Sequence, residues 1–393
     1  MKRSMNYFYD IINYFYPQAE IEDTSKIFSF TLLPEEIQNY CLAFTESKVA
    51  VLCLVSRYFN QHVKAIRIVN NRYYPYLDDR CLGFLPNMRI LDLKSNIMIG
   101  NDGISSLKNL HTLKLVNNNK INDRGISKLI NLTFLDISYN YMISNNGISS
   151  LTNLRYLNLC KNKQVTDKGI SELTNLIELS LFNNNSITNI STLINLTSLN
   201  LTNNDVITNI SVLTNLTKLE LIDNRMITAI GGLTNLRSLK LNNNFRITDE
   251  EIWQLTNLQS LSLGAKNLIT DIGIINLTNL TDLDLSSNTM ITDQGVAFLF
   301  NLNKLNLSHN ETISDEGIRN SLNLRIIILN QSKKITRDGI PRGVKIKGSL
   351  YHKPISCEQR RLMGSMGQTG HRYNVGKRYN CSSIYTDSSS SSD

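Results

Sequence analysis

The sequence predicts an α/β solenoid, in which short parallel strands stack along the chain and each strand is followed by a returning segment. An L-x-x-L-x-L-x-x-N unit recurs twelve times, and its middle apolar residue always advances by 22 or 20 residues. A unit this short cannot bury its own leucines, whereas stacked units bury them in one continuous core. The twelve markers are Leu91, Leu113, Leu135, Leu157, Leu179, Leu199, Leu219, Leu239, Leu261, Leu283, Leu305 and Ile327. Val63, Ile66, Ile68 and Asn71 fit the same template and predict a thirteenth, leading unit.

The L-x-L part of each unit predicts a strand, because alternate residues of a strand point to the same face. The closing Asn should turn inward, where its amide can satisfy backbone groups exposed as the strand bends away. Lys266 and Ser332 stand where this Asn is expected and should interrupt the series. This combination of features is that of a leucine-rich-repeat solenoid. The Asn positions are Asn96, Asn118, Asn140, Asn162, Asn184, Asn204, Asn224, Asn244, Asn288 and Asn310.

The returning half of the unit differs between the two unit lengths. The 22-residue units read I-T-D-x-G-I-x-x-L, as at Ile291–Val296, where Thr or Asp can cap a short helix. The three central 20-residue units, such as the one containing Ile207–Leu213, lack the two residues around the Gly. We therefore expect short helices on the convex side of the longer units, and extended or 3₁₀ backbone in the shorter ones.

Composition and the spacing of apolar residues divide the chain into four parts. Residues 1–27 are rich in aromatic residues, and residues 28–64 carry two apolar stripes at helical spacing. The repeats and an end cap occupy residues 65–349, with Val344 and Ile346 predicting a last capping strand. Residues 350–393 are basic and Ser-rich, with too few apolar residues to fold, and predict a disordered tail.

Residues 28–64 contain LPEEI at 33–37 and LVSRYFN at 54–60, and this pair of motifs resembles the F-box, a short helical module that closes on V-[CS]-[KR]-x-[FW]. The repeats are similar to those that follow F-boxes in F-box/LRR proteins, in the Asn- and Ile-rich style of protist and large-DNA-virus members. The turn Thr45–Lys48 departs from the pattern, since it is one residue shorter and lacks the usual proline. The resemblance implies docking onto the Skp-type adaptor of an SCF (cullin-RING) ubiquitin ligase. The implied adaptor-binding residues are Leu33, Pro34, Glu36, Ile37, Val55 and Phe59.

A solenoid offers its concave sheet, with three outward columns of side chains, as a recognition surface. Exposed aromatic residues are enriched at binding hot spots, and Phe134 and Tyr156 fall in one column on adjacent strands. The alternative interpretation is that these rings only shield one another. The candidate substrate-binding residues are Phe134, Asp136, Tyr156, Asn158, Glu178 and Phe182.

The sequence offers no catalytic constellation, no metal site and no cofactor motif, so we expect a non-enzymatic protein. The five His are dispersed, and the six Cys lie far apart without C-x-x-C, which favours an intracellular protein with reduced thiols, cytoplasmic or nuclear. No apolar run is long enough to span a membrane, and no secretory signal is expected at the N-terminus. We expect the chain by itself to be monomeric.

The net charge of +8 belongs to one end of the chain. Residues 333–393 hold twelve Lys and Arg against four Asp and Glu, and residues 1–332 hold 29 of each sign. The repeats are therefore neutral, which argues against nucleic-acid binding by the solenoid.

Two functions follow from these observations. The first is the substrate-recognition subunit of an SCF-type ligase, in which residues 28–64 dock the adaptor and the concave face binds an unknown target protein. The second is a leucine-rich-repeat interaction scaffold without a role in ubiquitylation, in which residues 28–64 only cap the solenoid.

Overall fold

The computed structural model describes residues 65–67, 79, 82 and 86–349, all within the first of two compact units, Met1–Tyr351 and His352–Asp393. The aromatic-rich segment 1–27, the F-box-like segment 28–64 with its six adaptor-facing residues, and the tail 350–393 lie outside the described residues.

The described residues form one parallel sheet of 14 strands in sequence order, from β1 to β14. The marker positions pair in register, as in Leu135↔Leu157. Ile66 pairs with Leu91, which confirms the strand of the leading unit, and Ile327 pairs with Ile346, which confirms the capping strand. The strands are β1 Ala65–Arg67, β2 Ile90–Asp92, β3 Thr112–Lys114, β4 Phe134–Asp136, β5 Tyr156–Asn158, β6 Glu178–Ser180, β7 Ser198–Asn200, β8 Lys218–Glu220, β9 Ser238–Lys240, β10 Ser260–Ser262, β11 Asp282–Asp284, β12 Lys304–Asn306, β13 Ile326–Asn330 and β14 Lys345–Ser349.

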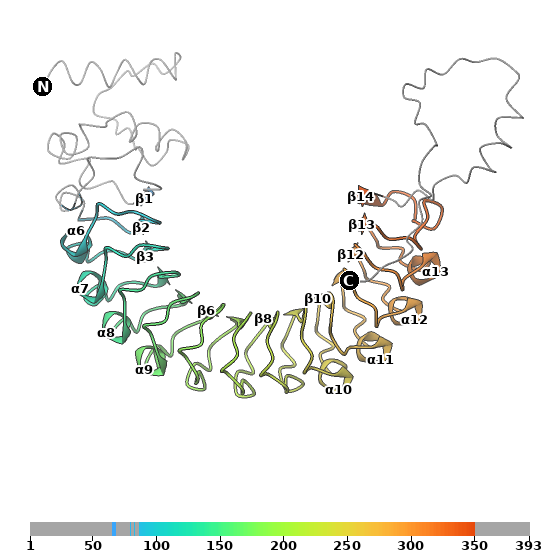
Figure 1. The fold of residues 1–393 in the computed structure, drawn as a ribbon, viewed down its shortest axis with the longest axis horizontal. Helices are drawn as coiled ribbons and strands as arrows, with labels where there is room; N and C mark the ends of the chain where they lie inside the picture. Colours follow the sequence, from blue (N-terminus) through green and yellow to red (C-terminus); the bar gives the residue numbers. More distant parts are fainter. Residues whose placement is uncertain (1–64, 68–78, 80–81, 83–85, 350–393) are drawn as a thin grey trace, which may run out of the picture. The chain divides into compact units, whose positions relative to one another are not determined.

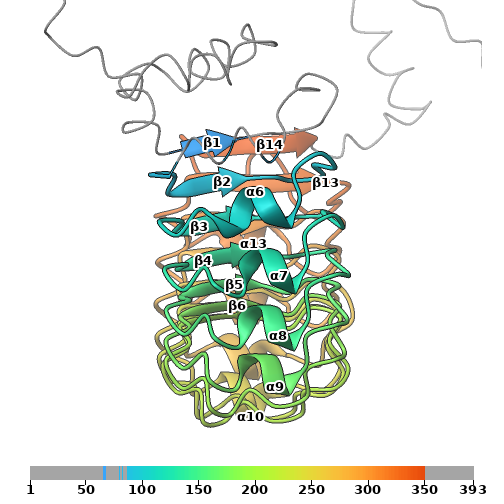
Figure 2. The same cartoon turned by 90° about the vertical axis from the view of Figure 1, so that its left-hand side faces the viewer.

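Short helices return the chain in the 22-residue units, as predicted. Figure 1 shows the strands along the inner side of the repeat stack and the helices on its outer side, and Figure 2 shows the same stack from its N-terminal side. Between β6 and β9 the described backbone contains no helix, which confirms the extended return of the three shorter units. The helices are α6 Asn101–Ser105, α7 Asp123–Ile126, α8 Asn145–Ile148, α9 Asp167–Ile170, α10 Asp249–Ile252, α11 Asp271–Ile274, α12 Asp293–Val296 and α13 Asp315–Ile318.

The core consists of stacked columns of Leu and Ile between the sheet and the returning segments. The marker side chains from Leu91 to Ile327 are at most 2% exposed. Because each column runs through every repeat, burial of apolar area stabilises neighbouring units together rather than any unit alone.

The predicted inward turn of the closing Asn is confirmed. Asn118 is fully buried, its Nδ2 donates to the backbone oxygens of Leu93 and Asn96, and its Oδ1 accepts from two amides of its own turn, Lys120 and Ile121. The side chain thus satisfies groups from two turns, its own and that of the preceding repeat, that would otherwise be buried without partners. We call this buried series the Asn ladder.

The expected interruptions of the Asn ladder are each confirmed in part, at Lys266 and at Ser332. Asn267, one residue later, is buried and donates to the carbonyl oxygens of Leu263 and Gly264, while Lys266 is exposed. This turn is one residue longer between Leu263 and its buried Asn than the other turns. Both carbonyl oxygens that accept from Asn267 Nδ2 belong to its own turn, so this side chain fills the buried position without the bond to the preceding repeat. Ser332 is also buried, and its hydroxyl donates to the carbonyl oxygen of Leu307.

A second set of side chains joins the repeats on the convex side. The Asp at the start of a helix accepts from the Thr or Ser that precedes the next helix: Ser144 donates its amide to Asp123 Oδ1 at 2.7 Å and its hydroxyl to Asp123 Oδ2 at 2.6 Å. The sequence predicts only local helix capping for these residues, which Thr292 does provide to the amide of Gln294. The additional role of the Asp is a link between repeats.

Candidate interaction surface

The concave sheet presents three columns of side chains, because each strand buries its leucines and turns the intervening residues outward. Phe134 and Tyr156 begin β4 and β5 in the first column, Asp136 and Asn158 follow in the second, and Glu178 begins β6. The strand register places Phe134 opposite Tyr156 and Tyr156 opposite Glu178. The structure therefore brings five of the six candidate residues onto three adjacent strands.

The rings of Phe134 and Tyr156 are stacked face to face. Their centroids lie 3.9 Å apart and their planes differ by 2°. On the side of β3, the Lys114 Nζ lies 5.7 Å from the centroid of the Phe134 ring, within the range of a cation–π contact. Both rings are partly exposed, so the pair is a fixed aromatic surface rather than part of the core.

Hydrogen bonds fix the polar residues beside the ring pair. Asp136 Oδ1 accepts from the Ser138 amide at 3.0 Å and from its hydroxyl at 2.7 Å, and Asp136 Oδ2 accepts from Asn158 Nδ2 at 3.2 Å. Asn158 Oδ1 in turn accepts from the amide of Cys160. Asp136 is thus held in place as a negative charge next to the rings.

The electrostatic surroundings of Tyr156 are acidic. Burial raises the pKa of its phenol, and the carboxylates of Asp136 and Glu178 raise this pKa further, against a smaller opposite effect of the hydrogen bond with Asn158. The Tyr156 phenol therefore stays protonated well above neutral pH and can donate a hydrogen bond to a partner.

Phe182 does not join this cluster. It lies in the third column, four residues along the chain from Glu178, which corresponds to about 13 Å along a strand. Cys160, in the same third column, is 9% exposed, and burial raises the pKa of its thiol, so this cysteine is a weak nucleophile.

A charged cluster on β8 and β9 is not among the predicted site residues. Glu220 Oε1 lies 3.2 Å from Lys218 Nζ and 2.9 Å from Lys240 Nζ, and Glu220 Oε2 accepts from Asn200 Nδ2 at 3.1 Å. Burial would raise the pKa of Glu220, but its contacts with Lys240 and Lys218 outweigh that effect and lower it. The sequence signal for this cluster is a Lys two residues before the Glu and a second Lys 20 residues after it, at the same position of the next repeat.

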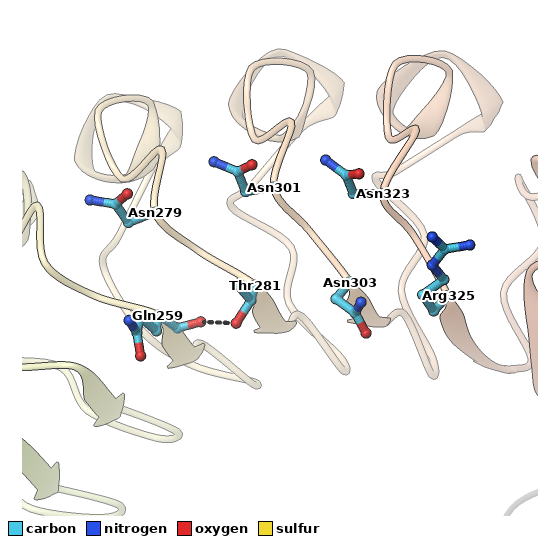
Figure 3. Close-up of a pocket in the computed structure, with 7 residues that line it drawn as sticks. All are labelled: Gln259, Asn279, Thr281, Asn301, Asn303, Asn323 and Arg325. Atoms are coloured by element: carbon cyan, nitrogen blue, oxygen red, sulfur yellow. Dashed lines mark hydrogen bonds between the residues drawn. The ribbon is translucent and has the colours of Figure 1, made fainter.

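A polar groove lies along the edge where the strands of the last repeats begin. Figure 3 shows Asn279, Asn301 and Asn323 along one side and the residues that lead into the strands along the other. Each of these Asn donates to a carbonyl oxygen of the preceding repeat, as Asn301 does to Thr278 at 2.9 Å, so the row has a structural role. The recurrent N-L of the repeats is the sequence signal for this row of Asn residues. The other lining residues are Gln259, Thr281, Asn303 and Arg325.

Among the described residues, no group of three or more His, Cys, Asp or Glu side chains is arranged to hold a metal ion. Within the same part of the chain, no helix is long and apolar enough to cross a membrane.

A parallel sheet over a Leu core, with polar and aromatic side chains on the concave face, defines the class of repeat scaffolds that bind protein partners. Comparison with family models identifies the repeats. A model described as Leucine Rich repeat matches residues 84–108, 106–130, 128–151, 150–174 and 298–320, and Leucine Rich repeats (2 copies) matches residues 256–295. The chain therefore contains leucine-rich repeats and is a scaffold for protein–protein interaction. Neither match covers the F-box-like segment.

Among solved structures that are similar to this chain, an internalin shows the same fold. An internalin (InlF) from Listeria monocytogenes is 24% identical, with a TM-score of 0.58 over 78% of this chain and 95% of the internalin chain. A chain of the yeast Rad7–Elc1 complex is 18% identical, with a TM-score of 0.47 over 88% of this chain and 97% of that chain. A leucine-rich-repeat protein from Leptospira interrogans is 23% identical with a TM-score of 0.45, covering 78% and 98%. No curated protein sequence matches this chain.

Proposed function

We propose that this protein is the substrate-recognition subunit of an SCF-type ubiquitin ligase, acting inside the cell, in the cytoplasm or nucleus, without catalytic activity of its own. The observation that carries the proposal is the pair of motifs LPEEI and LVSRYFN, which precedes β1, the first strand of the repeats, in the sequence. A Skp-type adaptor binds the F-box-like segment, and the cullin ligase assembled on that adaptor supplies the chemistry. The concave face then holds the protein that is to be ubiquitylated.

Co-purification with a Skp-type adaptor tests the adaptor half of this proposal. A Leu33→Asp, Pro34→Ala double variant should lose the adaptor, because both residues fall in the motif that contacts it in F-box proteins. A Ser47→Ala variant, changed in the same segment outside the motif positions, should retain it. Circular dichroism of each variant verifies that the repeats remain folded. If the intact chain does not bind the adaptor, the ligase proposal is wrong.

The fixed Phe134–Tyr156 pair supports the second half of the proposal, binding of the target protein on the concave face. A Phe134→Ala, Tyr156→Ala double variant should lose the proteins that crosslink to the wild-type chain, while a Ser238→Ala control in the same column keeps them. Capture that persists in the double variant would remove these rings from the binding site.

The leucine-rich repeats also support a scaffold without a ligase role. This second function predicts partner capture that depends on Phe134 and Tyr156 in a chain that binds no adaptor. The two experiments together therefore separate the two functions.

A further inference from the structure

The second face of the Tyr156 ring is turned toward Glu178. The strands follow one another in the order β4, β5, β6, and the register places Phe134, Tyr156 and Glu178 side by side. Since Phe134 stacks on one face of Tyr156 with nearly parallel planes, the opposite face looks along the same direction toward β6. The exposed Glu178 thus lies on the strand next to the open face of the ring. We call the solvent-facing space over this ring face and the Glu178 side chain the slot.

The two ends of the ring stack differ in one respect. At the β3 end, the ammonium group of Lys114 lies over the face of Phe134. At the β6 end, the ion pairs among the described residues do not include Glu178, and its carboxylate accepts no hydrogen bond from a described residue. Glu178 is therefore an unpaired carboxylate beside an open aromatic face.

We infer that the slot between Tyr156 and Glu178 binds an arginine side chain of the partner protein. This inference rests on the proposed function, in which the concave face holds a protein, and it specifies the chemistry of that partner. A guanidinium group is planar and always charged, so it can stack on the Tyr156 ring while its N–H groups pair with the Glu178 carboxylate. A lysine ammonium group could pair with the carboxylate, but it is not planar and cannot stack on the ring.

A second carboxylate adds to the attraction of Glu178 for a cation. Asp136 adds a second negative charge, held by Ser138 and Asn158. The nearest basic cluster, around Glu220, lies two and three strands beyond β6, about 10 to 15 Å away at the usual strand spacing. The two lysines of that cluster are therefore too far away to pair with Glu178.

Titration of the full-length chain with two blocked tripeptides, Ac-Gly-Arg-Gly-NH₂ and Ac-Gly-Gln-Gly-NH₂, tests this inference. Ring signals are followed by NMR in protein carrying ¹³C-labelled tyrosine, and the Tyr156 signals are assigned with Tyr156→Phe. We expect the arginine peptide to shift the Tyr156 signals saturably and the glutamine peptide to leave them in place.

Two variants with the same loss of charge sharpen the test. Glu178→Gln should weaken binding of the arginine peptide by about fivefold, the upper range for an exposed ion pair. Asp282→Asn removes an exposed carboxylate from the same column, on β11, and should leave binding unchanged. The absence of a saturable shift, or equal binding by wild type and Glu178→Gln, overturns the inference. Adaptor co-purification with the Glu178→Gln variant is unaffected by the slot, so failure of the slot and failure of the ligase proposal are distinguishable.

Discussion

At the scale of the residue, each Asn of the ladder satisfies backbone groups that no solvent can reach. Asn162 is fully buried, donates to the carbonyl oxygen of Asn140 at 2.8 Å, and accepts from the amides of Gln164 and Val165 at 2.9 and 3.0 Å. A single side chain thus supports its own turn and the turn of the preceding repeat. No apolar residue of similar volume can replace these bonds.

Asn162→Ala should therefore lower the free energy of unfolding by about 2 to 4 kcal/mol, because several buried polar groups lose their partner at once. Urea unfolding followed by circular dichroism measures the loss. Asn153→Ala is the matched control in the same region. The exposed Asn153 makes one hydrogen bond, to the carbonyl oxygen of Ile130, and its removal should cost about 1 kcal/mol or less. Equal losses in the two variants would contradict this account of the Asn ladder.

Two carboxylates make the stability of the solenoid depend on pH. Hydrogen bonds and the charges of Lys240 and Lys218 lower the pKa of Glu220 in spite of its burial, and hydrogen bonds from Thr188 and Asn189 likewise outweigh burial and lower the pKa of Asp167. A carboxylate with a lowered folded-state pKa stabilises the fold above its unfolded pKa, about 4, and this stabilisation is lost as the pH falls through the folded-state value.

We therefore expect the urea midpoint to fall as the pH drops below about 4.5. Glu220→Gln should flatten part of this dependence, since its amide does not titrate. Glu250→Gln, which changes an exposed Glu, is the control for the loss of one carboxylate. The same pH slope in wild type and Glu220→Gln would rule out a contribution from Glu220.

At the scale of the element, the convex helices explain the Gly of the 22-residue units. A Cβ atom added to Gly147 would lie 2.5 Å from Asp123 Oδ1 and 3.3 Å from the Asp123 Cα. Asp123 cannot move away without breaking its bonds to Ser144, so a side chain at position 147 competes with the link between repeats. The D-x-G sequence is thus a requirement set by two neighbouring repeats together.

Gly147→Ala should destabilise the protein by about 1 to 3 kcal/mol, the usual cost of overpacking, despite the better helix propensity of Ala. Gly232→Ala is the matched control: a Cβ there meets no atom within 4 Å, and the change should be neutral or slightly stabilising. Adding Asp123→Ala to Gly147→Ala relieves the clash, so the double variant should lose less than the sum of the two single losses. Additive losses in thermal unfolding would argue against the clash.

The return from 20-residue to 22-residue units needs a special residue. The unit before α10 has no helix and hence no Asp link, and α10 carries Glu251 where the other described helices have Gly. Glu251 Oε2 reaches back and accepts from the amides of Ile230 and Gly231 at 2.6 and 2.7 Å. The Glu251 carboxylate replaces the Asp link at this junction. Its acceptor lies in the later of the two repeats, whereas the Asp of the other links lies in the earlier one.

Glu251→Ala should leave these two amides without a partner and weaken the contact between the third short unit and α10. We expect a loss of about 1 to 3 kcal/mol and faster hydrogen exchange at Ile230 and Gly231. Glu250→Ala, at the adjacent exposed position, should change neither quantity. Unchanged exchange at both amides in Glu251→Ala would show that the link does not stabilise this junction.

At the scale of the whole molecule, the periodicity predicts the strands, their parallel order, the core and the Asn ladder, because all of these follow from the spacing of Leu and Asn. The Asp links could not be predicted, since a Thr-Asp pair before a helix has an equally good local role as a cap. The displaced Asn267 was missed for a similar reason: the length of a unit does not reveal where within it one residue has shifted.

The candidate site could be predicted only in part. The two-residue period places Phe134, Tyr156 and Glu178 on one face, and the unit length places them on neighbouring strands. The mutual orientation of the two rings and the hydrogen bonds that hold Asp136 depend on side-chain torsions, which no spacing determines. The cluster around Glu220 was not predicted as a site, because its ion pairs also depend on side-chain torsions.

Because of the Asp link and its Gly, a whole 22-residue unit can be removed or added without a mismatch between the neighbouring units. Removing residues 271–292 would join Thr270 to Asp293. Asp249 would then still accept its two hydrogen bonds from Thr270, and Gly295 would take the place of Gly273 beside it. Every bond across the new junction would be of a kind already present. The genes of such proteins can therefore gain or lose 22 codons at a time and alter the reach of the binding face while the core needs no redesign, except at the boundaries marked by Asp167 and Glu251.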